Sequence, residues 1–241
     1  MLRSVLFLVA FYLFTAVLFT LMIPTLVLPR EVAFCFLTVW TKGSQWLLKI
    51  FCHVHIKIKG LENLPKQNGY IIAAKHQSAM ETIIFHSVVP HVFYVFKKEL
   101  LWVPLANIHA IKTGCISIDR SAGGSAMRRM LDKTKKHLAE GLNLVIFPEG
   151  TRVAPNAPTR CAPGIAFLYA NCNVPVIPVA LNTGYCWGKN KTLKKAGTVT
   201  VSFLKPIQPG LEKRAFLQEL ERELDAEQNR LPLPQQEKTC N

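Results

Sequence analysis

The sequence lacks the patterns that mark several large classes of protein. Its seven cysteines are odd in number and scattered, and no CxxC pair occurs, so we expect no structural zinc site and favour a reducing compartment. It has no GxSxG elbow of the kind that carries the nucleophile in many serine hydrolases. It also has no RNP, KH or Cys/His finger motif, which makes nucleic acid the least favoured partner.

Acidic residues are few. There are 15 Asp and Glu against 29 Lys and Arg, a net charge of +14, while half of all residues are hydrophobic. Nucleic acid would attract such a charge, but the combination with a hydrophobic composition suits an anionic membrane surface. The length of 241 residues predicts one catalytic domain with an appendage.

Charge is absent from the first part of the chain, between Ser4 and Pro29. As a helix this stretch would be about 39 Å long, enough to cross a bilayer, although Pro24 is expected to bend or end it. No small-residue cleavage site follows, so a retained anchor is favoured over a cleaved signal peptide. A second apolar segment, Val32–Cys52, is interrupted by polar residues with tryptophans near the breaks, as in a helix at an interface.

Residues 1–52 are therefore predicted to be a membrane anchor of spanning or interfacial helices. Arg30, Lys42 and Lys49 outweigh Arg3 on the other side of the apolar run. The positive-inside rule would then leave the catalytic domain on the cytoplasmic side of the membrane.

Short apolar runs recur over residues 53–230 and predict an α/β domain. Val54, Ile56 and Ile58 alternate with polar residues, as in a half-buried strand. Helical spacing from Met127 to Leu138, and again over Leu211–Asn229, predicts helices, and residues 231–241 have the composition of a loose tail. Further runs bring the sheet to about seven strands; they are Tyr70–Ala74, Val92–Phe96, Cys115–Ile118, Leu142–Phe147, Val174–Leu181 and Thr198–Leu204.

The segment AAKHQSAMET places His76 five residues before Glu81, where a strand gives way to a helix. A histidine can take a proton from an alcohol as it attacks a carbonyl, and a carboxylate on the far ring nitrogen fixes the tautomer. The pair is thus a candidate catalytic dyad, although the same spacing also arises by chance where a histidine only packs. Ser78 is better explained as a cap of the following helix than as a nucleophile.

A second motif, FPEGTR, spans Phe147–Arg152 and follows a very apolar strand. It presents Glu149, Thr151 and Arg152 together at the end of that strand. An ordinary turn needs only the proline and the glycine. The adjoining arginine points to a phosphate, which a guanidinium binds in a fork.

A third motif, GCISIDR, spans Gly114–Arg120. Its strand delivers Asp119 and Arg120 to what is predicted to be the same edge of the sheet. A surface salt bridge is the alternative interpretation of this acidic and basic pair.

The order of these motifs, with VPVIPVAL at Val174–Leu181, resembles the four sequence blocks of the glycerolipid acyltransferases, specifically the 1-acylglycerol-3-phosphate acyltransferases. The resemblance implies a single α/β acyltransferase domain with a mixed sheet flanked by helices, and residues 1–52 resemble the two-helix membrane motif of some members. The first block normally has an aspartate in the acid position. Here Glu81 stands there, so the side chain is one methylene longer.

The resemblance also implies a role for each matching residue. His76 is the general base, Glu81 orients it, and Pro178 shapes the acyl pocket. The implied reaction moves an acyl group from a thioester of acyl carrier protein or coenzyme A to 1-acylglycerol-3-phosphate in the membrane, with no cofactor and no metal. The acceptor and its phosphate are expected to contact Gly114, Arg120, Glu149, Gly150, Thr151 and Arg152.

Two other interpretations keep the fold. In the first, the acceptor is another lysolipid, such as the lyso form of an amino-acid lipid, and Arg152 contributes little to its affinity. In the second, the protein binds lipid without catalysis, which the departure at Glu81 leaves open.

Overall fold

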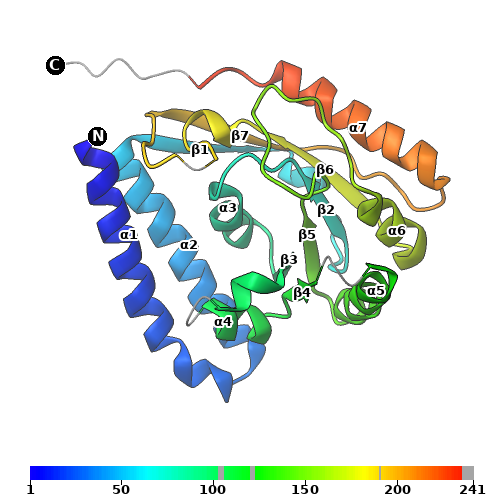
Figure 1. Cartoon of the computed structure of the whole chain (residues 1–241), viewed down its shortest axis with the longest axis horizontal. Coiled ribbons are helices and arrows are strands. Elements are labelled where there is room, and N and C mark those ends of the chain that lie inside the picture. The colour runs from blue at the N-terminus through cyan, green and yellow to red at the C-terminus, as the bar shows by residue number, and fades with distance from the viewer. Residues whose placement is uncertain (103–105, 120–122, 190, 235–241) are drawn as a thin grey trace.

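The computed structural model describes residues 1–102, 106–119, 123–189 and 191–234. Within them a seven-stranded sheet has the order β1-β7-β6-β2-β5-β3-β4 (Figure 1). All neighbouring strands are parallel except β6 and β7, which are antiparallel, so the predicted mixed sheet is confirmed. The strands are β1 Val54–Lys59, β2 Ile71–Ala74, β3 Val92–Lys97, β4 Ile116–Ile118, β5 Asn143–Ile146, β6 Val176–Leu181 and β7 Gly197–Phe203.

Helices cover both faces of this sheet (Figure 1). They are α1 Leu2–Leu21, α2 Arg30–Cys52, α3 Met80–Val88, α4 Ala106–Lys112, α5 Gly123–Ala139, α6 Pro163–Cys172 and α7 Lys213–Arg230. Short 3-10 turns lie at Ile23–Leu26, Leu61–Asn63, Lys98–Trp102 and Thr183–Tyr185.

The central strand β2 consists of apolar residues because both of its faces are buried. Ile71 and Ala73 belong to the core on one face, with residues of α5, α6 and α7. Tyr70, Ile72 and Ala74 belong to the core on the other face, with residues of α2 and α3. Successive side chains of a strand point to opposite faces, so a strand covered on both sides loses the alternation of polar and apolar residues.

The helix α7 looks charged on most sides in sequence, yet it buries an apolar stripe. Phe216, Leu220 and Leu224 are fully buried at intervals of four residues and pack on the face of the sheet that α6 also covers. The helix therefore belongs to the domain core.

The first two helices form a hairpin alongside the domain (Figure 1). Helix α1 ends at Leu21, and the following 3-10 turn has Pro24 in its first turn, where the sequence places the break. Of the described residues, only α1 makes a helix long and apolar enough to cross a membrane. Contacts tie it to the domain near both ends, because Ser4 Oγ accepts a hydrogen bond from the Lys194 N–H and the Phe19 carbonyl lies 3.0 Å from Nε2 of His109.

The parallel strands β2 and β5 bring the AAKHQSAMET and FPEGTR motifs to one edge of the sheet. Ala73 of β2 lies beside Ile146 of β5, so the segments after these strands, which begin with Lys75 and Phe147, leave the sheet side by side. Strand β6 is the other neighbour of β2, and its carboxyl end leads to Thr183. The carboxyl ends of parallel strands are the usual location of a site in such a sheet.

Candidate active site

His76 and Glu81 lie in contact at this edge. Nδ1 of His76 is 2.9 Å from Oε2 of Glu81, whose side chain is fully buried in the first turn of α3. A carboxylate accepts hydrogen bonds only, so Nδ1 carries the proton of the neutral ring. Nε2 is then the nitrogen with a lone pair, as a general base requires.

The Glu81 carboxylate accepts hydrogen bonds from two further groups, on Ser78 and Thr183. The Ser78 backbone N–H lies 2.9 Å from each carboxylate oxygen, and the Thr183 hydroxyl donates to Oε1. Ser78 Oγ itself accepts the backbone N–H of Met80 at 3.1 Å, although the N-cap residue of α3 is Ala79 and not the serine. Sequence reasoning missed Thr183, because it is 102 residues from Glu81 along the chain and carries no motif.

The imidazole of His76 is also held by stacking. Its ring lies 3.9 Å from the ring of Phe147, nearly parallel at 15°, and Tyr94 stacks on Phe147 in turn with centroids 6.2 Å apart. The phenylalanine of the FPEGTR motif thus fixes the plane of the histidine that the first motif supplies. Sequence reasoning gave Phe147 no such part.

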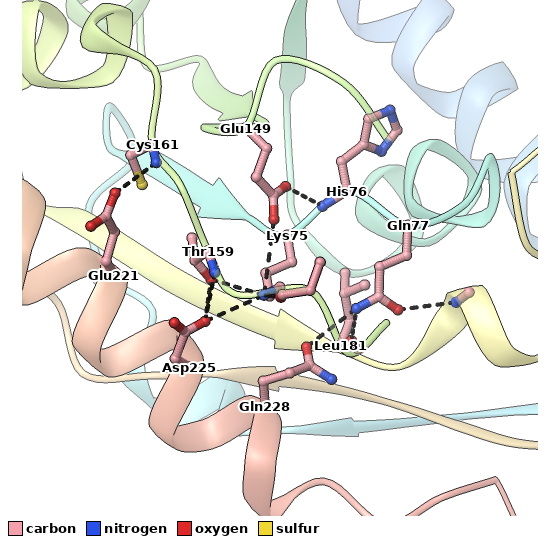
Figure 2. A network of polar contacts seen from close by, with 12 residues as sticks. Lys75, His76, Gln77, Glu149, Thr159, Cys161, Leu181, Glu221, Asp225 and Gln228 are labelled. Carbon is pink, nitrogen blue, oxygen red and sulfur yellow. Dashed lines mark hydrogen bonds and ion pairs between the residues drawn. The ribbon is translucent and has the colours of Figure 1, made fainter. Parts of the chain in front are cut away.

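Glu149 faces the backbone that carries the base. Its Oε2 accepts the His76 backbone N–H at 2.8 Å (Figure 2), and the carboxyl is almost wholly buried, with 3% of the side chain exposed. Burial raises the pKa of Glu149 to about 7, while the His76 N–H and the ammonium of Lys75 act to lower it. Glu149 thus supports the backbone of the base, and its part in gripping the glycerol phosphate stays a prediction.

The free energy of unfolding is expected to fall by roughly 3 kcal/mol between pH 4.5 and pH 7 through Glu149 alone. The ordinary pKa of 4.5 applies to the unfolded chain and about 7 to the folded one. In that window the unfolded chain has released a proton that the folded protein keeps, so stability falls as pH rises. Denaturation of Glu149→Gln beside wild type at pH 5 and pH 8 measures this. The variant gains relative stability at pH 8, and a difference independent of pH would contradict the assignment.

The other residues of FPEGTR line the turn after β5. Gly150 has a φ of +68°, which favours glycine, and its N–H donates to the Phe147 carbonyl. Thr151 is exposed and Arg152 is half-buried. Across the described parts of the chain, no side chain or carbonyl pairs with the Arg152 guanidinium, so it is available to an anion.

The described residues of the third motif, GCISIDR, lie at β4 and on either side of it. Gly114 precedes β4, which β3 and β5 separate from β2, and its φ of +87° serves a tight turn against Leu142 and His137. Asp119 pairs with Lys98 at 2.6 Å, and Arg120 lies outside the described residues, so a salt bridge between Asp119 and Arg120 stays untested.

Pro178 lies in the interior of the sheet. It is opposite Ala73 of β2 in the register of β6, which is buried along its whole length. Pro178 therefore lies beside the strand that carries His76, and its part in an acyl pocket stays a prediction.

Comparison with known proteins agrees with this arrangement. Residues 55–182 match the profile of the Acyltransferase family. The 1-acyl-sn-glycerol-3-phosphate acyltransferase of Pseudomonas aeruginosa is 32% identical over 162 residues, which are 67% of this chain and 63% of that protein. The alpha enzyme of the same name from Homo sapiens is 26% identical over 66% of this chain and 57% of its own. The chain thus spans less than two thirds of the length of either relative.

A solved structure has the same fold over nearly the whole chain. The crystal structure of the 1-acyl-sn-glycerophosphate (LPA) acyltransferase from Thermotoga maritima has a TM-score of 0.80 and 21% identity, and the match covers 95% of this chain and 96% of that one. The family profile spans more than half of the chain and includes the His76–Glu81 pair and FPEGTR. This chain belongs to the acyltransferase family.

Proposed function

We propose that the chain transfers a fatty acyl group from an acyl thioester to the free hydroxyl of 1-acylglycerol-3-phosphate and so forms phosphatidate. The observation that carries the proposal is the 2.9 Å contact between His76 and the buried Glu81, and the half-buried Arg152 follows the neighbouring strand β5. The names of the relatives in Pseudomonas aeruginosa and Homo sapiens support the choice of acceptor.

The geometry suits direct transfer. Nε2 of His76 takes the proton of the acceptor hydroxyl, and the alkoxide oxygen attacks the thioester carbonyl. Glu81 stabilises the imidazolium that forms, through Nδ1. When the tetrahedral intermediate collapses, the carbon–sulfur bond breaks and the proton passes to the departing thiolate. No acyl-enzyme is formed, and Ser78 takes no covalent part in the reaction.

The outward face of α1 suits a lipid acceptor. The helix lies along the domain, and its other side presents large apolar side chains, namely Leu2, Val5, Leu6, Val9, Tyr12, Leu13, Val17 and Leu21. Insertion of this face into a membrane would hold the site beside a substrate that stays in the lipid. We infer that the domain lies on the cytoplasmic side, where the thioesters of coenzyme A and acyl carrier protein are available.

Replacement of Arg152 by alanine is expected to raise the KM for lysophosphatidate by about ten- to a hundredfold, because one charged hydrogen bond to the phosphate is lost. The value of kcat is expected to change much less. Steady-state kinetics measures both constants, with Arg160→Ala as the control, because Arg160 is an exposed arginine beyond the motif. An unchanged KM would favour an acceptor without a phosphate.

The proposal is tested with the purified protein in phospholipid vesicles, supplied in turn with labelled acyl carrier protein and acyl coenzyme A. Lysophosphatidate, a lyso amino-acid lipid and vesicles without acceptor are compared. Labelled phosphatidate from either donor supports the proposal. Transfer to the amino-acid lipid alone would replace the acceptor, and binding of lipid without transfer would identify a silent member of the fold.

A further inference from the structure

Lys75, the residue before His76, is a lysine with no exposed surface. Its Nζ donates to the Ala157 carbonyl at 3.0 Å and to Thr159 Oγ1 at 2.8 Å, and lies 3.5 Å from Oδ1 of Asp225 on α7 (Figure 2). A buried ammonium is costly unless its charge and its donors are met. All three partners lie on segments more than eighty residues away in sequence.

Two carboxylates share this cation. Oδ1 of Asp225 also accepts the N–H and the hydroxyl of Thr159, at 2.9 Å and 2.5 Å. Oε1 of Glu149 lies 4.0 Å from the Lys75 ammonium, and no hydrogen-bond donor reaches this buried oxygen from the residues that the structure describes. Lys75 is therefore the cation that compensates Glu149, whose other oxygen accepts the His76 backbone N–H.

Gln77, the residue after His76, is also held by hydrogen bonds on the side of α7. The Gln77 amide donates to the Leu181 carbonyl at 2.8 Å and to Oε1 of Gln228 on α7 at 3.3 Å, and its oxygen accepts the Gly184 N–H. Lys75 and Gln77 thus point toward α7, while the ring of His76 points away from it (Figure 2). The backbone of His76 is held between two anchored neighbours.

The polar face of α7 contacts the loop of residues 157–161, which also binds Lys75. Glu221 accepts the Cys161 N–H at 2.7 Å, and Asp225 and Gln228 follow on that side of the helix at intervals of four and three residues. The helix thus holds the 157–161 loop, Lys75 and Gln77 together (Figure 2).

We propose that Lys75 is a positioning residue for the transfer reaction, which fixes the backbone of His76 by joining the buried Glu149 carboxyl to Asp225 of helix α7. The proposal rests on His76 acting as the base of the proposed function. Without the ammonium, the buried Glu149 carboxyl that holds the His76 N–H loses its cation and its link to Asp225. His76 keeps Glu81 but moves relative to the acceptor.

The first test replaces Lys75 by methionine, which keeps the length of the side chain and removes the charge. The kcat for phosphatidate formation is expected to fall by about a hundredfold, because a displacement of about 1 Å costs that much, while the KM for lysophosphatidate stays near its wild-type value. Lys205→Met, at an exposed lysine before α7, is the matched control. A kcat within twofold of wild type would overturn the proposal.

A double-variant cycle separates positioning from general support of the fold. In Lys75→Met/Glu149→Gln the buried pair becomes neutral, and the glutamine oxygen can still accept the His76 N–H. The double variant is expected to have a higher kcat than Lys75→Met, whereas independent effects would multiply and lower it further. The second outcome would contradict the assignment.

Hydrogen exchange keeps the test independent of turnover. The His76 amide is expected to exchange at least tenfold faster in Lys75→Met than in wild type, with the β6 amides unchanged. If the His76 amide exchanges faster in Lys75→Met but the wild-type protein transfers no acyl group, the proposed function is wrong and the positioning network is still supported. If the exchange of this amide is unchanged, the positioning network is contradicted. If Lys75→Met does not fold, Asp225→Asn is measured in its place, with a smaller change in the same direction expected.

Discussion

Replacement of His76 by alanine is expected to lower the kcat for phosphatidate formation by about a thousandfold, within the range that general base catalysis contributes. Glu81 binds Nδ1 of the His76 imidazole, Phe147 stacks on its ring, and Glu149 accepts the backbone N–H of His76. Alanine keeps the backbone contact with Glu149 and removes the group that takes the proton. Initial rates at saturating donor and acceptor measure the loss.

The control for this variant is His55→Ala. His55 lies on β1, and β7 and β6 separate that strand from β2. The control is expected to keep the wild-type rate, and both variants are expected to unfold as cooperatively as wild type. A folded His76→Ala protein with an undiminished rate would remove His76 from the mechanism and favour the interpretation of a silent, lipid-binding protein with an unrelated contaminant activity.

Glu81→Gln is expected to lower kcat by about a thousandfold or more, close to the loss at His76, because an amide in place of the orienting carboxylate disturbs the histidine tautomer. The site offers Glu81 three donors, from His76 Nδ1, the Ser78 N–H and the Thr183 hydroxyl. A glutamine has one accepting oxygen, so its amino group must face a donor. Rates measured across pH test this, because only an altered tautomer and basicity of His76 change the shape of the profile.

Glu81→Asp is the informative companion, since the family normally has aspartate in this position. Here the shorter side chain cannot keep both the His76 ring and the Ser78 N–H, which lie about 2.9 Å from the glutamate oxygens. We expect kcat to fall by at least about tenfold, the equivalent of one hydrogen bond to a charged group. A wild-type rate in Glu81→Asp would mean that the backbone adjusts to either acid.

The sequence was a good guide wherever the residue pattern depends on local geometry. The seven apolar runs predicted the strands, and the position of Pro24 predicted the end of α1. The parallel order of β2 and β5 then explains why His76 and FPEGTR meet, although 71 residues separate His76 from Phe147.

The contacts that support the site could not be predicted, because they join residues distant in sequence. A lysine beside a histidine reads as a surface cation, and only the fold shows that Lys75 is buried against Asp225 and Glu149. Thr183 and Phe147 likewise gain their roles from neighbouring strands. Gly114 lies in a turn before β4, which two strands separate from β2, so its part in holding the acceptor stays a prediction.

The central claim is that the His76–Glu81 site acylates a phosphorylated lysolipid, and a competition between two acceptors tests it most directly. Lysophosphatidate and the monoacylglycerol that lacks only its phosphate are offered together in the same vesicles, with one labelled acyl thioester and the wild-type protein. We predict that labelled phosphatidate exceeds labelled diacylglycerol by at least about tenfold, the ratio that one charged hydrogen bond to the phosphate supports. Equal labelling of both products, or labelling of neither, would contradict the account.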